Sequence, residues 1–226
     1  MDPWAQRRVS VSGVTLRLPA VVLVFVVVDL AWEVVKANLD RGVRGEWPWR
    51  FTVLDVSSCA TLVTLLGGIV VTRVQLSHTL RPVLSWSGFR GDSHQVVDSR
   101  RTVMVRNAGG GRAVVCSVSY RLRAAEAYAG RVAEPPGWVH FNVVVDFFEA
   151  LGLERDRDFF LLHVGAGAAI PMSSNWRDGM ELLALNAKGR ERLSVVDIRL
   201  VVCDVLGDTH QRDLHGIRPS VTSSAT

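Results

Sequence analysis

The sequence predicts a helical membrane hairpin followed by a mainly-β domain, an antiparallel β-sandwich with one inserted short helix; a small β-barrel is the alternative. Two long apolar segments fall in the first third of the 226-residue chain. Short β-branched runs bounded by turn residues fill the rest. We expect an N-terminal flank at 1–15, the hairpin at 16–80, the β-domain at 81–216 and a disordered Ser/Thr-rich tail at 217–226.

The first apolar segment, about 16–36, is long enough to cross a bilayer as a helix. Residues 20–28 carry no polar side-chain atom, and twenty helical residues rise about 30 Å, the thickness of the hydrocarbon core. A cleaved signal peptide is the alternative, but no small-x-small cleavage site follows, and Asp29 and Glu33 stand at the far end. We therefore interpret this segment as an uncleaved anchor.

The second apolar segment, about 51–76, contains small and hydroxylated residues and the pair Gly67-Gly68. Small residues let helices approach closely in lipid, and hydroxyl groups can bond across the contact. Gly67 and Gly68 are therefore candidate helix-packing positions, either between the two helices or between copies of the chain. The alternative is that lipid merely tolerates them.

Three acids share the loop end of this hairpin. In an antiparallel pair, Asp29 and Glu33 come level with Asp55, within one or two turns of the membrane surface. Carboxylates in lipid are costly and often functional, but at this depth water and nearby basic residues can reach them. We expect a passive interfacial role; a cation or proton site is the alternative.

Lys and Arg residues give the expected orientation. Six arginines and the amino terminus flank the outer ends of the hairpin, against four basic residues in the loop. This excess predicts a multi-pass inner-membrane protein with its N-terminus and β-domain in the cytoplasm. Basic residues that are nearly all arginine indicate a GC-rich bacterial genome. The residues counted are Arg7, Arg8, Arg17, Arg73, Arg81 and Arg90 against Lys36, Arg41, Arg44 and Arg50.

Seven runs in the domain are predicted to be strands. The run from Ala113 alternates apolar and polar residues as a half-buried strand does, and the glycine-rich segment 107–111 before it is expected to form a hairpin or bulged turn. The seven runs are 82–86, 102–106, 113–122, 159–164, 181–185, 195–205 and 209–214.

One helix is expected among the strands, just after Asn142. Apolar residues from Val143 to Leu151 fall on one helical face, Asn142 suits the N-cap and Gly152 the position after the C-cap. Alternating apolar residues leave a strand open as the alternative. Trp138, Phe141 and Trp176 either fill the core or line a pocket.

The segment Thr102-Val-Met-Val-Arg-Asn-Ala-Gly-Gly-Gly-Arg-Ala-Val-Val resembles the Asn-x-Gly-x-Gly-x-Ala turn between strands of bacterial membrane-anchored immunoglobulin-like β-sandwich proteins. The turn Asp204-Val-Leu-Gly207-Asp208 is similar to one near their last strands. The resemblance covers roughly 82–214. It implies an immunoglobulin-like sandwich and a membrane anchor.

No catalytic, cofactor-binding or metal site is predicted. Cys116 and Cys203 match no metal or redox spacing, and we expect two free thiols, with a disulfide as the alternative if the domain is outside the cell. His210 and His215 with Asp208 lack the further ligands that a metal needs. The net charge of +4 is dispersed along the chain, which argues against a nucleic-acid partner.

The expected function is therefore that of a non-enzymatic, membrane-anchored interaction or ligand-binding protein. Its expected partners are the lipid bilayer and a protein or a second copy of the chain bound through the hairpin. One alternative is a ligand-sensing membrane effector that oligomerises and perturbs the bilayer, as in bacterial defence. Another is a membrane-tethered hydrolase that uses the region around Asp208 and His210.

Overall fold

The computed structural model describes residues 6–10, 13–44, 46–49, 51–89, 93, 96, 98, 101–175 and 178–217. The expected disordered tail lies outside them except for Ile217, as do Trp176 and residues 1–5, 11 and 12 of the N-terminal flank. The chain divides into two compact units. One is Ser12–Thr79, and the other combines Met1–Val11 with Leu80–Thr226.

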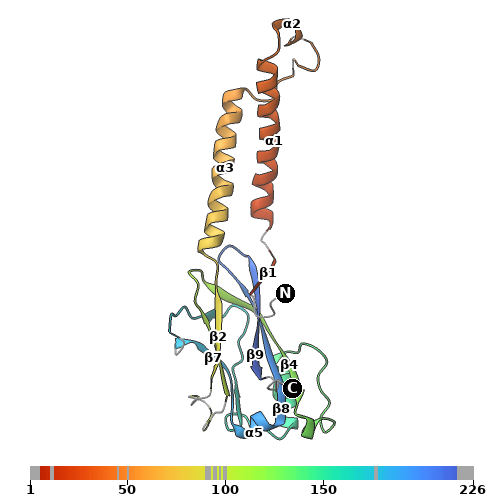
Figure 1. The fold of residues 1–226 in the computed structure, drawn as a ribbon, viewed down its shortest axis with the longest axis vertical. Coiled ribbons are helices and arrows are strands. Elements are labelled where there is room, and N and C mark those ends of the chain that lie inside the picture. The colour runs from red at the N-terminus through yellow and green to blue at the C-terminus, as the bar shows by residue number, and fades with distance from the viewer. Residues whose placement is uncertain are drawn as a thin grey trace, which may run out of the picture. The chain divides into compact units, whose positions relative to one another are not determined.

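The first unit is a pair of long apolar helices, α1 (Gly13–Ala37) and α3 (Val56–Thr79), which pack side by side in Figure 1. A short helix, α2 (Arg41–Arg44), lies in the loop between them. The second helix begins five residues later than expected, because Asp55 accepts hydrogen bonds from Ser58 and from the backbone at Ser57 and thereby satisfies the free N–H groups of its first turn.

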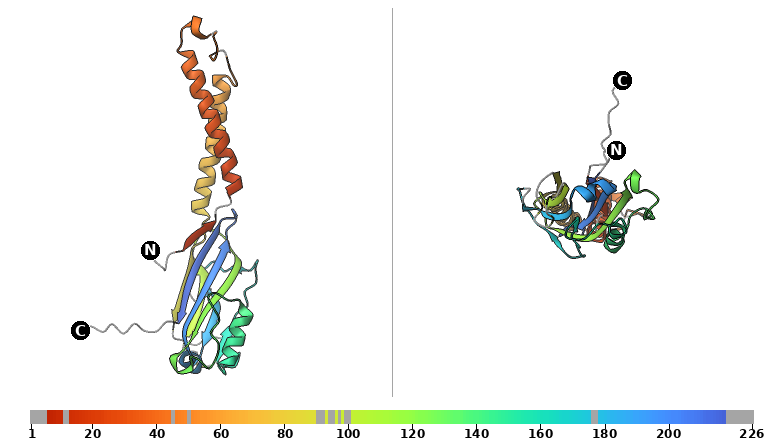
Figure 2. Two further views of the ribbon diagram at one scale, coloured as in Figure 1. Left: turned by 90° about the vertical axis from the view of Figure 1, so that its right-hand side faces the viewer. Right: turned by 90° about the horizontal axis from the view of Figure 1, so that it is seen from below.

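The second unit consists of two antiparallel sheets packed face to face. One sheet has the order β1-β9-β8-β4-β6 and the other β2-β3-β7-β5; the left view of Figure 2 has strands β8 and β9 of the first sheet (blue) toward the viewer. All seven predicted strands have counterparts. The strands are β1 (Arg7–Ser10), β2 (Leu84–Phe89), β3 (Arg101–Asn107), β4 (Ala113–Ala124), β5 (Phe159–Leu161), β6 (Ala169–Ile170), β7 (Met180–Leu185), β8 (Leu193–Cys203) and β9 (Thr209–Ile217).

One apolar core fills the space between the sheets. On β8, Val196, Ile198, Leu200 and Val202 are fully buried, whereas Arg199 and Val201 between them are half-buried. This period of two is what a strand with one buried face requires. Side chains of β3, β7 and the helix α4 (Phe141–Ala150) complete the same core.

The segment 107–111 is not the hairpin that its residues predict. It connects β3 to β4, and these strands belong to different sheets. The buried Asn107 side chain accepts hydrogen bonds from Val83 N and Gly109 N, both at 3.1 Å. A Cβ on Gly111 would lie 1.6 Å from the carbonyl oxygen of Leu80. Because glycine has no side chain, these residues allow the backbone of this turn to lie close against the backbone that leads into β2.

The inserted helix α4 (Phe141–Ala150) is confirmed, but its N-cap is His140 and not Asn142. Its buried residues, Val144, Phe147 and Phe148, join the core and place the helix against β4. Gly152 has φ +73°, as expected for the residue after the C-cap. A second short helix, α5 (Ala187–Arg192), was not predicted; it follows β7, and a 3₁₀ turn at Glu126–Tyr128 follows β4.

Cys116 and Cys203 form a disulfide, contrary to the free thiols that we expected. The two residues lie on neighbouring strands, and a bulge in β4 between Val115 and Ser117 brings Cys116 to a Cα–Cα distance of 6.2 Å from Cys203. This separation is within the range that a disulfide spans. Sequence spacing does not reveal it, because the pairing depends on the register of β4 against β8.

Candidate functional site

The three acids at the loop end of the hairpin lie near one another, and each has a partner. The Cys59 thiol donates a hydrogen bond to Asp29 at 3.3 Å, and Lys36 lies 3.3 Å from the buried Glu33 carboxylate. Asp55 caps α3. Among the described residues, no group of three or more His, Cys, Asp and Glu side chains is placed to hold a metal ion.

Aromatic residues surround the same end of the hairpin. The rings of Trp32 and Trp49 stack with centroids 4.6 Å apart, and the Trp32 indole N–H donates to the Phe51 carbonyl at 3.2 Å. A hollow of about 420 Å³ lies here, with Asp29 as its charged group and an otherwise almost wholly apolar lining. These contacts hold the loop onto the helix ends.

Gly67 and Gly68 are not at a close contact between α1 and α3. A Cβ built on either glycine meets nothing within 4 Å. The packing of the two helices on each other therefore does not require glycine at these positions. Within the described chain, this face of α3 is open.

The second unit contains a cavity of about 270 Å³ at the start of α4. Its floor comes from β4, one wall from the first turn of α4, and the other wall from the loop after β5. Polar and apolar groups both line it: Ser117, Val118, Tyr120, His140, Phe141, Asn142, His163, Val164, Gly165 and Ala166.

Backbone hydrogen bonds fix these three segments to one another. Tyr120 and Val139 exchange a pair of bonds of 2.8 and 2.7 Å, which place the start of α4 beside β4. Val115 likewise bonds to Ala168 and Gly167, both at 2.8 Å, and this holds the far wall. The cavity is therefore largely preformed, as small-molecule sites usually are.

Tyr120 is the buried polar residue of this cavity lining. The residue is 1% exposed, and its hydroxyl has no hydrogen-bond partner among the described residues. Burial raises the pKa of Tyr120 well above its ordinary value, so the hydroxyl stays protonated. At the mouth, the rings of Phe141 and His163 lie 4.6 Å apart, and the Arg155 guanidinium lies 5.8 Å from the Phe141 ring.

The ionic groups around Asp204 and His210 stabilise a turn. Asp204 accepts hydrogen bonds from the backbone of Leu206 and Asp208 at 2.8 and 2.9 Å, and its second oxygen lies 3.2 Å from His210 Nε2. Asp208 pairs with Arg8 of β1. Asp208 and His210 are at most 2% exposed, so these side chains present no open surface to a substrate.

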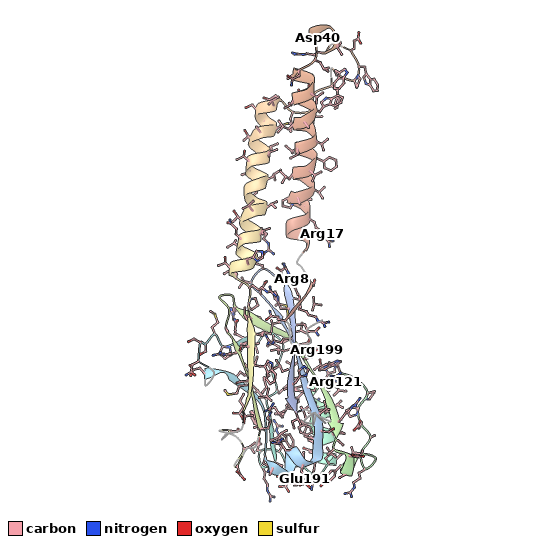
Figure 3. The ribbon with its side chains drawn as sticks, viewed as in Figure 1. Arg8, Arg17, Asp40, Arg121, Glu191 and Arg199 are labelled. Carbon is pink, nitrogen blue, oxygen red and sulfur yellow. A yellow bond between two sulfur atoms is a disulfide. The ribbon has the colours of Figure 1, made fainter. Side chains whose placement is uncertain are left out.

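A second ionic group covers the outer face of β4, β8 and β9. The buried Asp197 contacts Arg121 at 2.5 Å and His215 at 2.7 Å. The guanidinium carbon of Arg199 lies over the Trp138 ring, 3.9 Å from the ring centroid. Figure 3 labels Arg121 and Arg199 on their neighbouring strands. Trp138 therefore packs on charged side chains of the outer face and lines neither the core nor the cavity.

Sequence reasoning identified few of the cavity residues. Phe141 was named as a candidate pocket residue, but Tyr120, His140, Asn142 and His163 were not connected with one site. They come from three separate segments and form no motif.

Comparisons with known proteins add no assignment: no family model, no curated protein and no solved structure matches the chain.

Proposed function

We propose that this chain is a membrane protein anchored by the α1–α3 hairpin, with a β-sandwich domain that acts by binding. The observation that carries the proposal is the exposure of the two helices. Both are long and apolar enough to cross a membrane, and only 11% and 6% of their most apolar stretches are buried. Helices that are apolar all round and uncovered by protein are suited to lipid.

The strand β1 supports two crossings. It precedes α1 in the chain and pairs with β9, whereas β2 follows α3 and belongs to the facing sheet. Both ends of the hairpin therefore join one folded domain, which requires them to be on the same side of the bilayer. Cleavage after α1, as in a signal peptide, would remove a strand of the sheet.

A charge placed on α3 tests the anchor. Leu65 lies near the centre of α3 and is 59% exposed; Val205 on the sandwich unit is 56% exposed. We expect Leu65→Arg to oppose insertion by about 3 kcal/mol and to reduce the fraction of chain that resists carbonate extraction from membranes. Val205→Arg, the matched control, is expected to leave that fraction unchanged. Equal extraction of both variants would contradict the anchor.

The strand orders favour an immunoglobulin-like topology. If β2, β3, β4, β5, β7, β8 and β9 correspond to strands A to G, then the sheets read ABED and GFC, as in the constant-type domain. The disulfide departs from that family's pattern, because it joins neighbouring strands of one sheet. The extra strands β1 and β6 extend the GFC sheet at its two edges.

Two observations bear on the orientation, and they disagree. The excess of arginines at the outer ends predicts that the domain lies in the cytoplasm. The Cys116–Cys203 disulfide favours an oxidising compartment, because cytoplasmic thiols are kept reduced. The arginine excess is small, whereas a structural disulfide rarely persists in a reducing cytoplasm. We therefore propose that the domain faces the oxidising side of the membrane.

Labelling of single introduced cysteines tests this orientation. In a Cys59→Ala background, we expect a membrane-impermeant maleimide to label Ser223→Cys in intact cells and to label Gly42→Cys in the hairpin loop only after permeabilisation. The reverse pattern would place the domain in the cytoplasm, as the arginines predict, and would leave the anchor itself unaffected.

A binding role is favoured over hydrolysis because the Asp208–His210 group is buried and engaged in a turn. One observation favours the membrane effector as a second candidate: the open face of α3 at Gly67 and Gly68 suits close packing against another copy. Dye release from liposomes that contain the inserted chain distinguishes the two, because the effector perturbs the bilayer and the binding protein does not.

A further inference from the structure

We propose that the cavity at the start of α4 binds a small carboxylate with a short apolar body. The inference rests on the proposed binding role of the domain and names its ligand class. It follows from three features of the described residues: the start of a helix, the hydroxyl of a buried tyrosine that lines the cavity, and a lining that contains no acidic side chain.

The first turn of α4 offers N–H donors that nothing in the helix satisfies. His140 is the N-cap, yet its side chain makes no capping hydrogen bond, and the first turn contains no acid. The first backbone bond that closes the helix is from Val144 N to His140 O at 3.3 Å. Unsatisfied N–H groups and the helix dipole together favour an anion at this position.

The Tyr120 hydroxyl is an independent indication of a ligand. Tyr120 is 1% exposed and lines the cavity, and its hydroxyl makes no hydrogen bond to another described residue, so a partner for this hydroxyl has to come from within the cavity. Because its pKa is raised, the hydroxyl is available as a donor. A carboxylate in the cavity would supply the missing acceptor.

The lining favours a carboxylate over a phosphate. Phosphate sites commonly use Arg or Lys as strong donors, and none of the ten lining residues is Arg or Lys. Val118, Phe141 and Val164 provide apolar walls for a short hydrocarbon body. A volume of about 270 Å³ is at the lower end of the usual range for ligand sites, so the ligand must be small.

The test uses the full chain in lipid nanodiscs, titrated calorimetrically with acetate, phenylacetate and benzoate. We expect saturable 1:1 binding, strongest for the aromatic acids, and no binding of neutral benzamide. Tyr120→Phe is expected to weaken benzoate binding about tenfold or more, since hydrogen bonds to charged groups are among the stronger ones. The matched control is Tyr128→Phe; Tyr128 is the other tyrosine, and its hydroxyl lies 3.5 Å from Glu191 on the exposed surface.

A second variant makes the result independent of Tyr120. Ala166 is an exposed residue of the cavity wall, and we expect Ala166→Trp to fill the cavity and abolish benzoate binding without lowering the unfolding temperature. No saturable binding of any of the three acids at millimolar concentration would overturn the proposal. Equal binding of benzamide, tighter binding of inorganic phosphate, or wild-type affinity in Tyr120→Phe would also overturn it. Carbonate extraction of the same protein shows separately whether the chain is anchored in the membrane, so that failure of the ligand proposal and failure of the anchor can be told apart.

Discussion

Gly111→Ala is expected to destabilise the β-sandwich more than any other single-methyl addition among its described glycines. The new Cβ would lie 1.6 Å from the Leu80 carbonyl oxygen and 2.4 Å from its carbonyl carbon. Both are backbone atoms and cannot rotate away. The turn and the entry to β2 would have to separate, and the Asn107 bond to Val83 would be lost with them. We expect a loss of at least about 3 kcal/mol.

Thermal unfolding of the full chain, followed by tryptophan fluorescence, measures this effect. For a domain of this size the loss corresponds to a fall of roughly 6–12 °C in Tm. Gly165→Ala is the matched control, because a Cβ there meets nothing within 4 Å and the residue does not have positive φ. Similar Tm values for the two variants would show that the turn does not pack closely on Leu80.

Removing the disulfide is expected to have the second large effect. Cys116 and Cys203 are 87 residues apart, so the bond closes a long loop in the unfolded chain. Loop-closure entropy predicts a stabilisation of about 4.6 kcal/mol for such a bond. We therefore expect Cys116→Ser/Cys203→Ser to lower Tm substantially, and dithiothreitol to lower the Tm of the wild-type chain to the same value.

Cys59 provides the control for this experiment. It is a free, buried thiol in the hairpin unit, and Cys59→Ser is expected to retain the full sensitivity of Tm to dithiothreitol. The double variant is expected to be insensitive to the reductant. A wild-type Tm that dithiothreitol does not change would mean that the bond contributes nothing to stability.

The elements that the sequence predicts correctly have strong local patterns. The two apolar helices follow from uninterrupted hydrophobic stretches, and β4 and α4 follow from periods of two and of about 3.6 residues. By contrast, β1 was missed because all four of its residues are exposed and carry no apolar alternation. The short helix α5 was missed for a similar reason, because Ala187–Arg192 contains no apolar stripe.

The errors in the fold and at the candidate site concern contacts between distant segments. Residues 107–111 have the composition of a tight turn, and a turn is present, but composition does not state whether the two strands share a sheet. Likewise, the register of β4 against β8 decides whether Cys116 meets Cys203. The cavity is a further case: its three walls are brought together by the fold, and none carries a motif.

The position of β1 makes the order of synthesis differ from the order of assembly. Residues 7–10 leave the ribosome before either apolar helix, but their partner β9 is the last of the described strands to be made. The first strand must therefore wait unpaired until the whole sheet exists. A domain cut free at Leu80 would lack it, and the edge of β9 from Thr209 to Gln211 would be left without its neighbour. Such an edge can accept a strand from another chain, which is a route to aggregation or to capture of an extended peptide.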